Sequence, residues 1–195
     1  MTVWQDQAKH CPLCSTELRE SEVGGRVRLR CVRCAFVLYR NPASAAAGVV
    51  FNERGEVLLV RRAIEPYRGY WALPAGYQEI DEDPAATVVR EVLEEAGVVI
   101  EVHGLLDLLF VRNDARKPAN VAVYLCHAVG GVLKPGAEES EAAWFPLEGL
   151  PSEIGFDNYA RILGRLRHAN SYPESPWTRI RRLVERPRDP RTPNS

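Results

Sequence analysis

The sequence lacks a long apolar run and has few lysines. No stretch of about 18 consecutive apolar residues occurs, so we expect no membrane-spanning helix. The first residues do not place a basic segment before an apolar core, as secretory signal peptides do, so we expect a cytoplasmic protein. Lysine occurs only at Lys9, Lys117 and Lys134, so arginine carries nearly all of the positive charge. The net charge of −1 indicates no particular partner.

Cysteine is also scarce, but its placement is informative. Four of the five cysteines form two Cys-x-x-Cys pairs, Cys11 with Cys14 and Cys31 with Cys34. In a chain without an export signal, this pattern indicates metal binding rather than disulfides. Four thiolates match a closed tetrahedral Zn²⁺ site, which would be structural because no coordination position is open for a substrate. We therefore expect residues 11–41 to form a zinc ribbon whose folding depends on the metal.

The segment between the cysteine pairs alternates Arg26, Arg28 and Arg30 with apolar residues, as a short strand does. We favour a docking or dimerisation role for the ribbon, and a homodimer is left open. The less favoured alternative is a grip on RNA or another partner through these arginines and Arg33. Residues 1–10 are expected to be a disordered lead, and residues 169–195 a basic, proline-rich tail that is solvated rather than bound to nucleic acid.

The most informative stretch contains one expected helix and a group of acids. Asp83 is a good N-cap, and Pro84 follows at the first helical position. Glu91, Glu94 and Glu95 then crowd one helical face, where like charges repel. Clustered carboxylates are hard oxygen ligands that suit Mg²⁺ or Mn²⁺, usually together with a substrate phosphate. The pattern therefore predicts a divalent cation site for a phosphate-containing ligand.

This stretch resembles the Nudix box, which reads Gly, five residues, Glu, seven residues, then Arg-Glu-apolar-x-Glu-Glu-x-Gly-apolar. The residues at its defined positions are Gly76, Glu82, Arg90, Glu91, Val92, Glu94, Glu95, Gly97 and Val98. The resemblance implies an α/β fold, namely a Nudix α/β/α sandwich with a mixed β-sheet over residues 42–168. Periodicity alone gives only α/β or α+β.

The resemblance also implies a role for each residue of the box. The Ala75 carbonyl and the carboxylates of Glu91, Glu94 and Glu95 correspond to ligands of the catalytic metal, with Glu91 a ligand or a base. Arg90 orients a helix carboxylate, Glu82 supports the site, and Gly76 and Gly97 are structural. Many family members use a downstream glutamate as the base. The acidic loop offers Glu138, Glu139 and Glu141 for that role, and we rank Glu138 first.

The implied reaction is metal-dependent hydrolysis of the pyrophosphate bond of a nucleoside diphosphate linked to another moiety, giving AMP and a phosphate ester. A ribbon followed by Tyr-x-Asn-Pro, and the sequence from Trp71 to Tyr77, are similar to a group that acts on FAD and ADP-ribose. The alternatives are an NADH pyrophosphatase or a decapping enzyme for NAD-capped RNA, although the Ser-Gln-Pro-Trp-Pro-Phe-Pro signature of NADH pyrophosphatases is absent after the box. A nucleotide sensor without catalysis is disfavoured because all of the box carboxylates are present.

Four residues before and within the box are candidates for substrate contacts. Arg61 and Arg62 would bind phosphate, because a guanidinium matches phosphate geometry. Tyr67 and Tyr77 would stack against the adenine or flavin ring of the substrate. No partner besides a small nucleotide is favoured.

Overall fold

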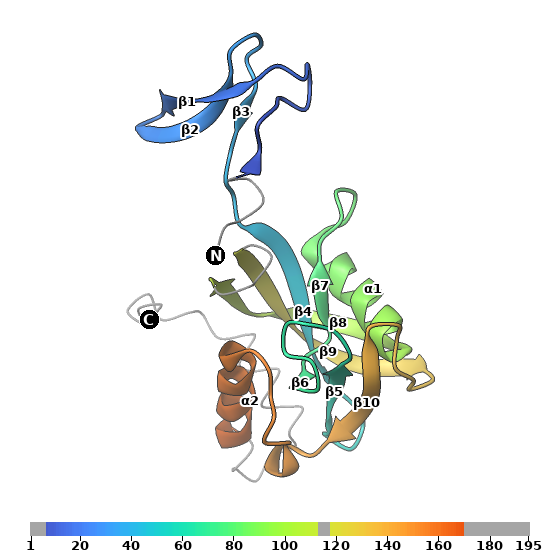
Figure 1. The fold of residues 1–195 in the computed structure, drawn as a ribbon. Helices are drawn as coiled ribbons and strands as arrows, with labels where there is room; N and C mark the ends of the chain where they lie inside the picture. The colour runs from blue at the N-terminus through green and yellow to red at the C-terminus, as the bar shows by residue number, and fades with distance from the viewer. Residues whose placement is uncertain (1–6, 113–117, 170–195) are drawn as a thin grey trace. The chain divides into compact units, whose positions relative to one another are not determined.

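The computed structural model describes residues 7–112 and 118–169 (Figure 1). Most of the expected lead, and the expected tail from residue 170 onward, lie outside these residues. The chain divides into two compact units, of which the first contains Met1–Ala43 and Arg112–Ala119 and the second contains the remainder. No helix in the described part of the chain combines the length and the apolar character that a membrane span requires.

The first unit is built on a small antiparallel sheet. Its strands are β1 (Leu18–Val23), β2 (Arg26–Cys31) and β3 (Val37–Leu38), which lie in that order. The glycines at positions 24 and 25 have φ values of 60° and 72°, which suits a tight turn between β1 and β2. In the described part of this unit, the core cluster around the cysteines has three buried residues, Cys11, Leu18 and Cys31, so apolar burial alone gives it little stability.

The second unit is built on a seven-stranded mixed sheet. Its strands are β4 (Ala43–Phe51), β5 (Val57–Arg62), β6 (Trp71–Ala72), β7 (Ala75–Tyr77), β8 (Val98–Val111), β9 (Ala119–Gly131) and β10 (Glu139–Phe145). The order is β10-β5-β4-β9-β8, with β6 paired to β5 and β7 paired to β4. β5 is antiparallel to both β4 and β10. β4 and β9 are neighbours in the sheet, and both begin at the same end of it, where the Ala43 N–H donates to the Pro118 carbonyl. The two strands therefore run parallel.

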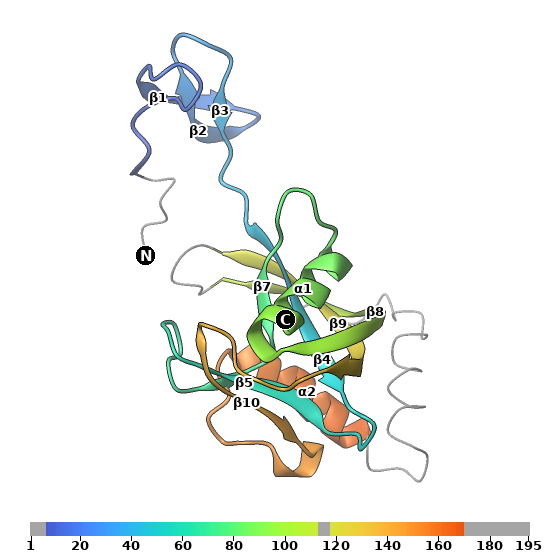
Figure 2. The same cartoon turned by 90° about the vertical axis from the view of Figure 1, so that its right-hand side faces the viewer.

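Two helices, α1 (Pro84–Ala96) and α2 (Asp157–Ala169), lie on opposite faces of this sheet (Figures 1 and 2). A short 3₁₀ helix, Leu147–Gly149, precedes α2. α1 packs Val88 and Val92 onto the β4 and β5 side chains of one sheet face. Gly48 permits this close approach, because a Cβ there would lie 3.0 Å from a methyl of Val88. The mixed sheet between two helices confirms the expected sandwich.

The ends of α1 are set by local sequence. The Asp83 side chain accepts a hydrogen bond of 2.8 Å from the Ala86 N–H, and Pro84 occupies the first turn. Gly97 ends the helix in the left-handed conformation, with φ of 68°. A Cβ on Gly97 would overlap the Val132 carbonyl, so glycine is required there for two independent reasons.

Candidate active site

The strand β7 lies directly against the acidic face of α1. A Cβ on Gly76 would overlap the Glu91 carboxylate, so a side chain at this position would displace that carboxylate from its place against β7. Next to it, the Ala75 N–H donates to Oε2 of Glu95 at 2.9 Å. The backbone of β7 therefore holds one acid of the helix by a hydrogen bond and leaves room for another.

Arg90 links four groups around the site. Its guanidinium donates to both carboxylate oxygens of Glu82, at 2.6 and 3.0 Å, and to the Tyr77 carbonyl at 3.0 Å. A further nitrogen donates to Glu91 at 2.7 Å and to Glu94 at 3.1 Å. Each donor of the guanidinium fork thus fixes an acid or a carbonyl, which is why lysine could not replace arginine here.

The Arg90–Glu82 pair has an electrostatic consequence. The hydrogen bond from Arg90 lowers the pKa of Glu82 to about 2, so Glu82 remains ionised at every physiological pH. In the same way, Glu82 and Glu91 raise the pKa of Arg90 above its ordinary value. Glu82 therefore anchors Arg90, and Arg90 orients the helix carboxylates.

Three carboxylates of the site lie close to one another, with Glu91 and Glu139 buried and Glu95 partly buried. Burial, and next the charge of Glu139, raise the pKa of Glu95 to about 9. Burial likewise raises the pKa of Glu91 and of Glu139, and the negative charges of neighbouring acids raise each pKa further. Several negative charges in one poorly solvated place are unfavourable unless a cation is near, so this donor set fits a hard divalent ion.

The loop before β10 is fastened to the C-terminal end of α1. The N–H groups of Val132, Lys134 and Gly136 donate at 3.0 Å to the carbonyls of Gly97, Ala96 and Glu95, in that order. These carbonyls would otherwise lack partners at the end of the helix. The loop thereby brings β10 alongside the acidic face of α1.

This attachment decides which acid of the loop enters the site. Glu139 is 8% exposed, and its charge contributes to the raised pKa of Glu95. Glu138, which we ranked first from the sequence, is exposed, and its carbonyl accepts a hydrogen bond from the Ala63 N–H. The structure therefore places Glu139, and not Glu138, among the site carboxylates. No signal in the sequence distinguishes these neighbours.

The two candidate arginines of β5 have different surroundings. Arg61 is held by Glu141 at 2.7 Å and by the Gly69 carbonyl at 2.9 Å, away from the helix acids. Arg62 is the register partner of Glu139, and its charge lowers the pKa of both Glu139 and Glu95. Of these two arginines, only Arg62 is therefore electrostatically coupled to the site carboxylates.

The candidate tyrosines are likewise separated. Tyr67 lies against Phe156, with ring centroids 4.6 Å apart, and the Arg62 guanidinium lies 5.8 Å from the centroid of the same Phe156 ring. Both aromatic residues have left-handed φ values, 63° and 62°, which are unusual for bulky side chains. The apolar spacing around Phe156 predicts a place in the C-terminal helix, whereas Phe156 precedes α2 and lies against Tyr67. Tyr77 contributes its backbone carbonyl to Arg90.

The four cysteines of the first unit also come together. The Sγ atoms of Cys11 and Cys34 are 3.6 Å apart, those of Cys14 and Cys31 are 3.5 Å apart, and those of Cys14 and Cys34 are 3.8 Å apart. A tetrahedron with Zn–S bonds of about 2.3 Å has edges of about 3.8 Å, so the spacing fits a Cys₄ zinc site. Among the possible metal ligands in the described ranges, these four cysteines form a group in which all of the ligand atoms lie within 4.8 Å of one another.

Local hydrogen bonds lower the pKa of two of these thiols, those of Cys14 and Cys31. Hydrogen bonds with Thr16 lower the pKa of Cys14 to about 6. Hydrogen bonds from the N–H groups of Cys34 and Arg33 lower the pKa of Cys31. Such N–H···S bonds stabilise a thiolate, the form that binds a metal.

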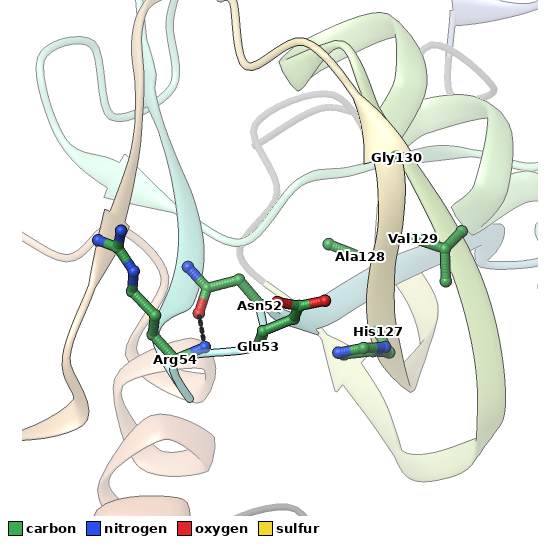
Figure 3. A pocket seen from close by; sticks show the side chains of 7 residues that line it. All are labelled: Asn52, Glu53, Arg54, His127, Ala128, Val129 and Gly130. Carbon is green, nitrogen blue, oxygen red and sulfur yellow. Dashed lines mark hydrogen bonds between the residues drawn. The ribbon is translucent and has the colours of Figure 1, made fainter.

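A hollow of about 560 Å³ elsewhere on the second unit is lined by the turn between β4 and β5 and by the end of β9. Figure 3 shows the Glu53 carboxylate turned toward His127, while Asn52 accepts a hydrogen bond of 2.9 Å from the Arg54 N–H. None of the box carboxylates lines this hollow, so it is not the site assembled around α1.

Comparison with known proteins agrees with this geometry. The model of the NUDIX domain family matches residues 41–168. A relative named ADP-ribose pyrophosphatase from Methanocaldococcus jannaschii is 34% identical over 134 residues, covering 68% of this chain and 78% of the relative. A human relative named 8-oxo-dGDP phosphatase NUDT18 is 37% identical over 122 residues, or 60% of this chain, and the match spans only 36% of that relative.

Solved structures lead to the same family. The crystal structure of a NUDIX hydrolase from Nitrosomonas europaea aligns with a TM-score of 0.77 and 28% identity, covering 86% of this chain and 94% of that one. The family match covers most of the second unit, and the box residues that define the pattern are those assembled around α1 and β7. The chain therefore belongs to the Nudix hydrolase family.

Proposed function

We propose that this chain is an Mg²⁺- or Mn²⁺-dependent hydrolase of the diphosphate bond in an ADP-linked nucleotide, with ADP-ribose as the first candidate and FAD as the second. The observation that carries this proposal is the gathering of the buried Glu91 and Glu139 and the partly buried Glu95 in one place, with a raised pKa at each. The name of the archaeal relative supports ADP-ribose. ADP-ribose would be divided into AMP and ribose 5-phosphate.

Four groups would hold the divalent ion: the carboxylates of Glu91, Glu94 and Glu95 and the carbonyl of Ala75. When bound, the ion would neutralise the diphosphate, polarise its phosphorus and favour ionisation of the attacking water. In the structure, Glu91 and Glu94 accept hydrogen bonds from Arg90, and Glu95 accepts one from the Ala75 N–H. Arg90 therefore sets the direction from which these acids approach the ion.

Glu139 takes the role that the sequence had suggested for Glu138. Its carboxylate would accept the proton of the water that attacks one phosphorus, while the bridging P–O bond breaks. A general base works best when its pKa lies near the operating pH, and burial shifts the pKa of Glu139 upward in that direction. The exposed carboxylate of Glu138 has no such environment.

Arg62 would contact a phosphate of the substrate. Its Nε donates to the Pro66 carbonyl at 2.7 Å and its guanidinium lies over Phe156, so the side chain is held in place. Its charge is coupled to Glu95 and Glu139 without an ion pair to either, so within residues 7–112 and 118–169 its other donors are available to an anion. Arg61, held by Glu141, is the weaker candidate.

The four cysteines would hold a structural Zn²⁺. The sulfur spacing and the N–H···S bonds support this assignment, and the small core of the first unit makes the metal necessary for its fold. Metal analysis of the purified chain should give one zinc per molecule. Replacement Cys31→Ser should release it, and full zinc content in that variant would refute the site.

A substrate panel tests the proposed function. ADP-ribose, FAD, NADH, 8-oxo-dGDP and NAD-capped RNA would each be offered with Mg²⁺, with Mn²⁺ and with a chelator. We expect the highest kcat/KM with ADP-ribose or FAD, and none without a divalent ion. Preference for 8-oxo-dGDP would assign the activity named for the human relative, preference for capped RNA would indicate decapping, and tight binding without turnover would indicate a sensor.

A further inference from the structure

The ribbon sheet separates its charges between two faces. Residues directly opposite on paired strands lie on the same face, and alternate residues of one strand lie on the same face. The pairs Leu18 with Cys31 and Leu29 with Leu38 lie on the face that covers the four-cysteine core. Glu20, the register partner of Leu29, lies on this face too. The register therefore assigns every other residue of β2 to the opposite face.

The opposite face carries the arginines. β2 places Arg26, Arg28 and Arg30 there, and their partners on β1 are Val23, Ser21 and Arg19. Of the strand residues assigned to this face by the β1–β2 and β2–β3 registers, none is acidic. We call the set Arg19, Arg26, Arg28 and Arg30 the arginine face.

Stability alone does not account for this arrangement. Arg19 and Arg30 are directly opposite each other, and like charges in that position destabilise a sheet. Arg19 is paired with Glu17 at 2.9 Å, but the structure gives no ion pair or side-chain hydrogen bond to Arg26 or Arg30 within the described ranges. An external polyanion would relieve this repulsion.

The spacing of the arginines indicates the kind of polyanion. Alternate residues of a strand are separated by about 6.7 Å, so the three arginines of β2 form a straight row of regular charges. Successive phosphates of an extended nucleic-acid strand have a similar separation. Acidic side chains reach this spacing only over a few alternate residues of one strand, whereas every phosphate of a nucleic-acid strand continues the row, so the row favours a phosphodiester backbone over an acidic protein surface.

An exposed aromatic ring adjoins the row. Tyr39 is 54% exposed, and the Arg28 guanidinium lies 5.1 Å from its ring centroid. Single-strand-binding proteins combine a basic track for phosphates with aromatic rings on which bases stack. Tyr39 beside Arg28 supplies both elements at one place on the ribbon.

We propose that the arginine face, together with Tyr39, binds single-stranded nucleic acid by its phosphate backbone, independently of the hydrolase site. Arg26, Arg28 and Arg30 each contact a phosphate, and the Tyr39 ring stacks on a base. The interaction is not selective for sequence, because it reads charge and base planes rather than base edges. This function adds to the proposed hydrolysis and does not depend on it.

The test is fluorescence anisotropy of the zinc-loaded full chain with a labelled single-stranded oligothymidine that has no diphosphate group. The variant combines Arg26→Gln, Arg28→Gln and Arg30→Gln. We expect its Kd to rise at least roughly tenfold and the slope of log K against log salt to become flatter by about 2, since each single-strand phosphate contact contributes about 0.7. Unchanged zinc content and ADP-ribose hydrolysis will show that the variant is folded.

Two matched controls make the result decisive. Replacing Arg179, Arg181 and Arg182 by glutamine removes the same charge from the C-terminal part of the sequence, and we expect the Kd to change less than roughly threefold. Equal weakening in both triple variants, or none in the ribbon variant, would overturn the proposal. Efficient competition by polyglutamate of matched charge would instead indicate an acidic protein partner and would also overturn it.

Tyr39→Ala tests the stacking contact. We expect roughly tenfold weaker binding to oligothymidine and unchanged binding to an abasic oligomer with the same phosphates, because stacking contributes about 1–3 kcal/mol per base. Equal weakening with both oligomers would show that Tyr39 only supports Arg28, and the stacking contact would then be rejected.

Discussion

Glu139 and Arg62 face each other across β10 and β5, and this pair lies beside the acidic face of α1. The guanidinium lowers, and burial raises, the pKa of Glu139, with burial the larger effect. One carboxylate and one guanidinium from two adjacent strands thus lie beside a group of acids that come from one helix. The register between these strands, rather than the box itself, selects which loop acid takes part.

The first prediction compares neighbouring acids of that loop. Glu139→Gln should lower kcat for the preferred substrate by about 10²- to 10⁴-fold, the usual effect of removing a general base. Glu138→Gln is the matched control and should leave kcat unchanged, because its carboxylate is exposed. Steady-state kinetics with both variants, after each has shown a native melting temperature, measures the difference. The reverse pattern would restore Glu138 as the base.

The second prediction compares neighbouring arginines of β5. Arg62→Ala should raise KM roughly tenfold or more, since a hydrogen bond to a charged group contributes about 1.5–3 kcal/mol. Arg61→Ala should affect KM little, because Arg61 is occupied by Glu141 and the Gly69 carbonyl. Initial rates over a range of substrate concentrations separate KM from kcat. A larger KM effect at Arg61 would contradict the assignment.

The third prediction concerns stability and pH at Glu82. Arg90 lowers the pKa of Glu82 from 4.5 in the unfolded chain to about 2 in the fold. A lowered pKa stabilises the fold above the unfolded value, and that stabilisation is lost as the pH falls from about 4.5 to about 2.

Glu82→Gln should therefore melt at a lower temperature than the unsubstituted chain at pH 7. The difference between the two should shrink steadily below about pH 4.5, as measured by circular dichroism at a series of pH values. Glu141→Gln removes an exposed acid paired with Arg61 and serves as the control, with a small effect at each pH. A melting difference at Glu82 that does not vary with pH would contradict the ion pair.

The fourth prediction separates the backbone strain of an alanine with positive φ from the steric overlap of its Cβ at the end of α1. Gly69 and Gly97 have φ values of 84° and 68°, so an alanine at either position is strained by about 1–2 kcal/mol. A Cβ at Gly69 meets nothing within 4 Å, whereas a Cβ at Gly97 overlaps the Val132 carbonyl. Gly97→Ala should therefore lower the free energy of unfolding by roughly 1–3 kcal/mol more than Gly69→Ala, by denaturant titration. Equal losses would mean that the backbone at Val132 moves away from the added Cβ at little cost in free energy.

Local chemistry explains why α1 could be predicted closely from the sequence. Its beginning depends on Asp83 and Pro84, and its end on Gly97, all of which act through the backbone within one turn. The helical spacing of Ile154, Phe156, Tyr159 and Ile162 predicts a C-terminal helix from Ile154 onward, whereas α2 begins at Asp157. Ile154 instead bridges to Trp71 and Phe156 has a left-handed φ, neither of which hydrophobic spacing reveals.

The details of the site outside the box depended on contacts between distant segments. Arg61 and Arg62 look equivalent in the sequence, yet neighbours on a strand point to opposite faces, and only the register of β5 with β10 assigns them. The loop before β10 is held by backbone hydrogen bonds to the end of α1, and the sequence does not identify the partners of these bonds. The cysteine pairs, by contrast, are a spacing pattern and predicted their own cluster.

The most direct test of the central claim is AMP release from ADP-ribose by the unsubstituted chain and by Glu95→Gln, each with Mg²⁺ and with a chelator. The acids around α1 are proposed to hold a divalent ion against a diphosphate, so AMP should appear only with the metal. Glu95→Gln should be roughly a thousandfold slower while keeping its native melting temperature. Equal AMP release in the chelator, or normal turnover in Glu95→Gln, would contradict the proposal.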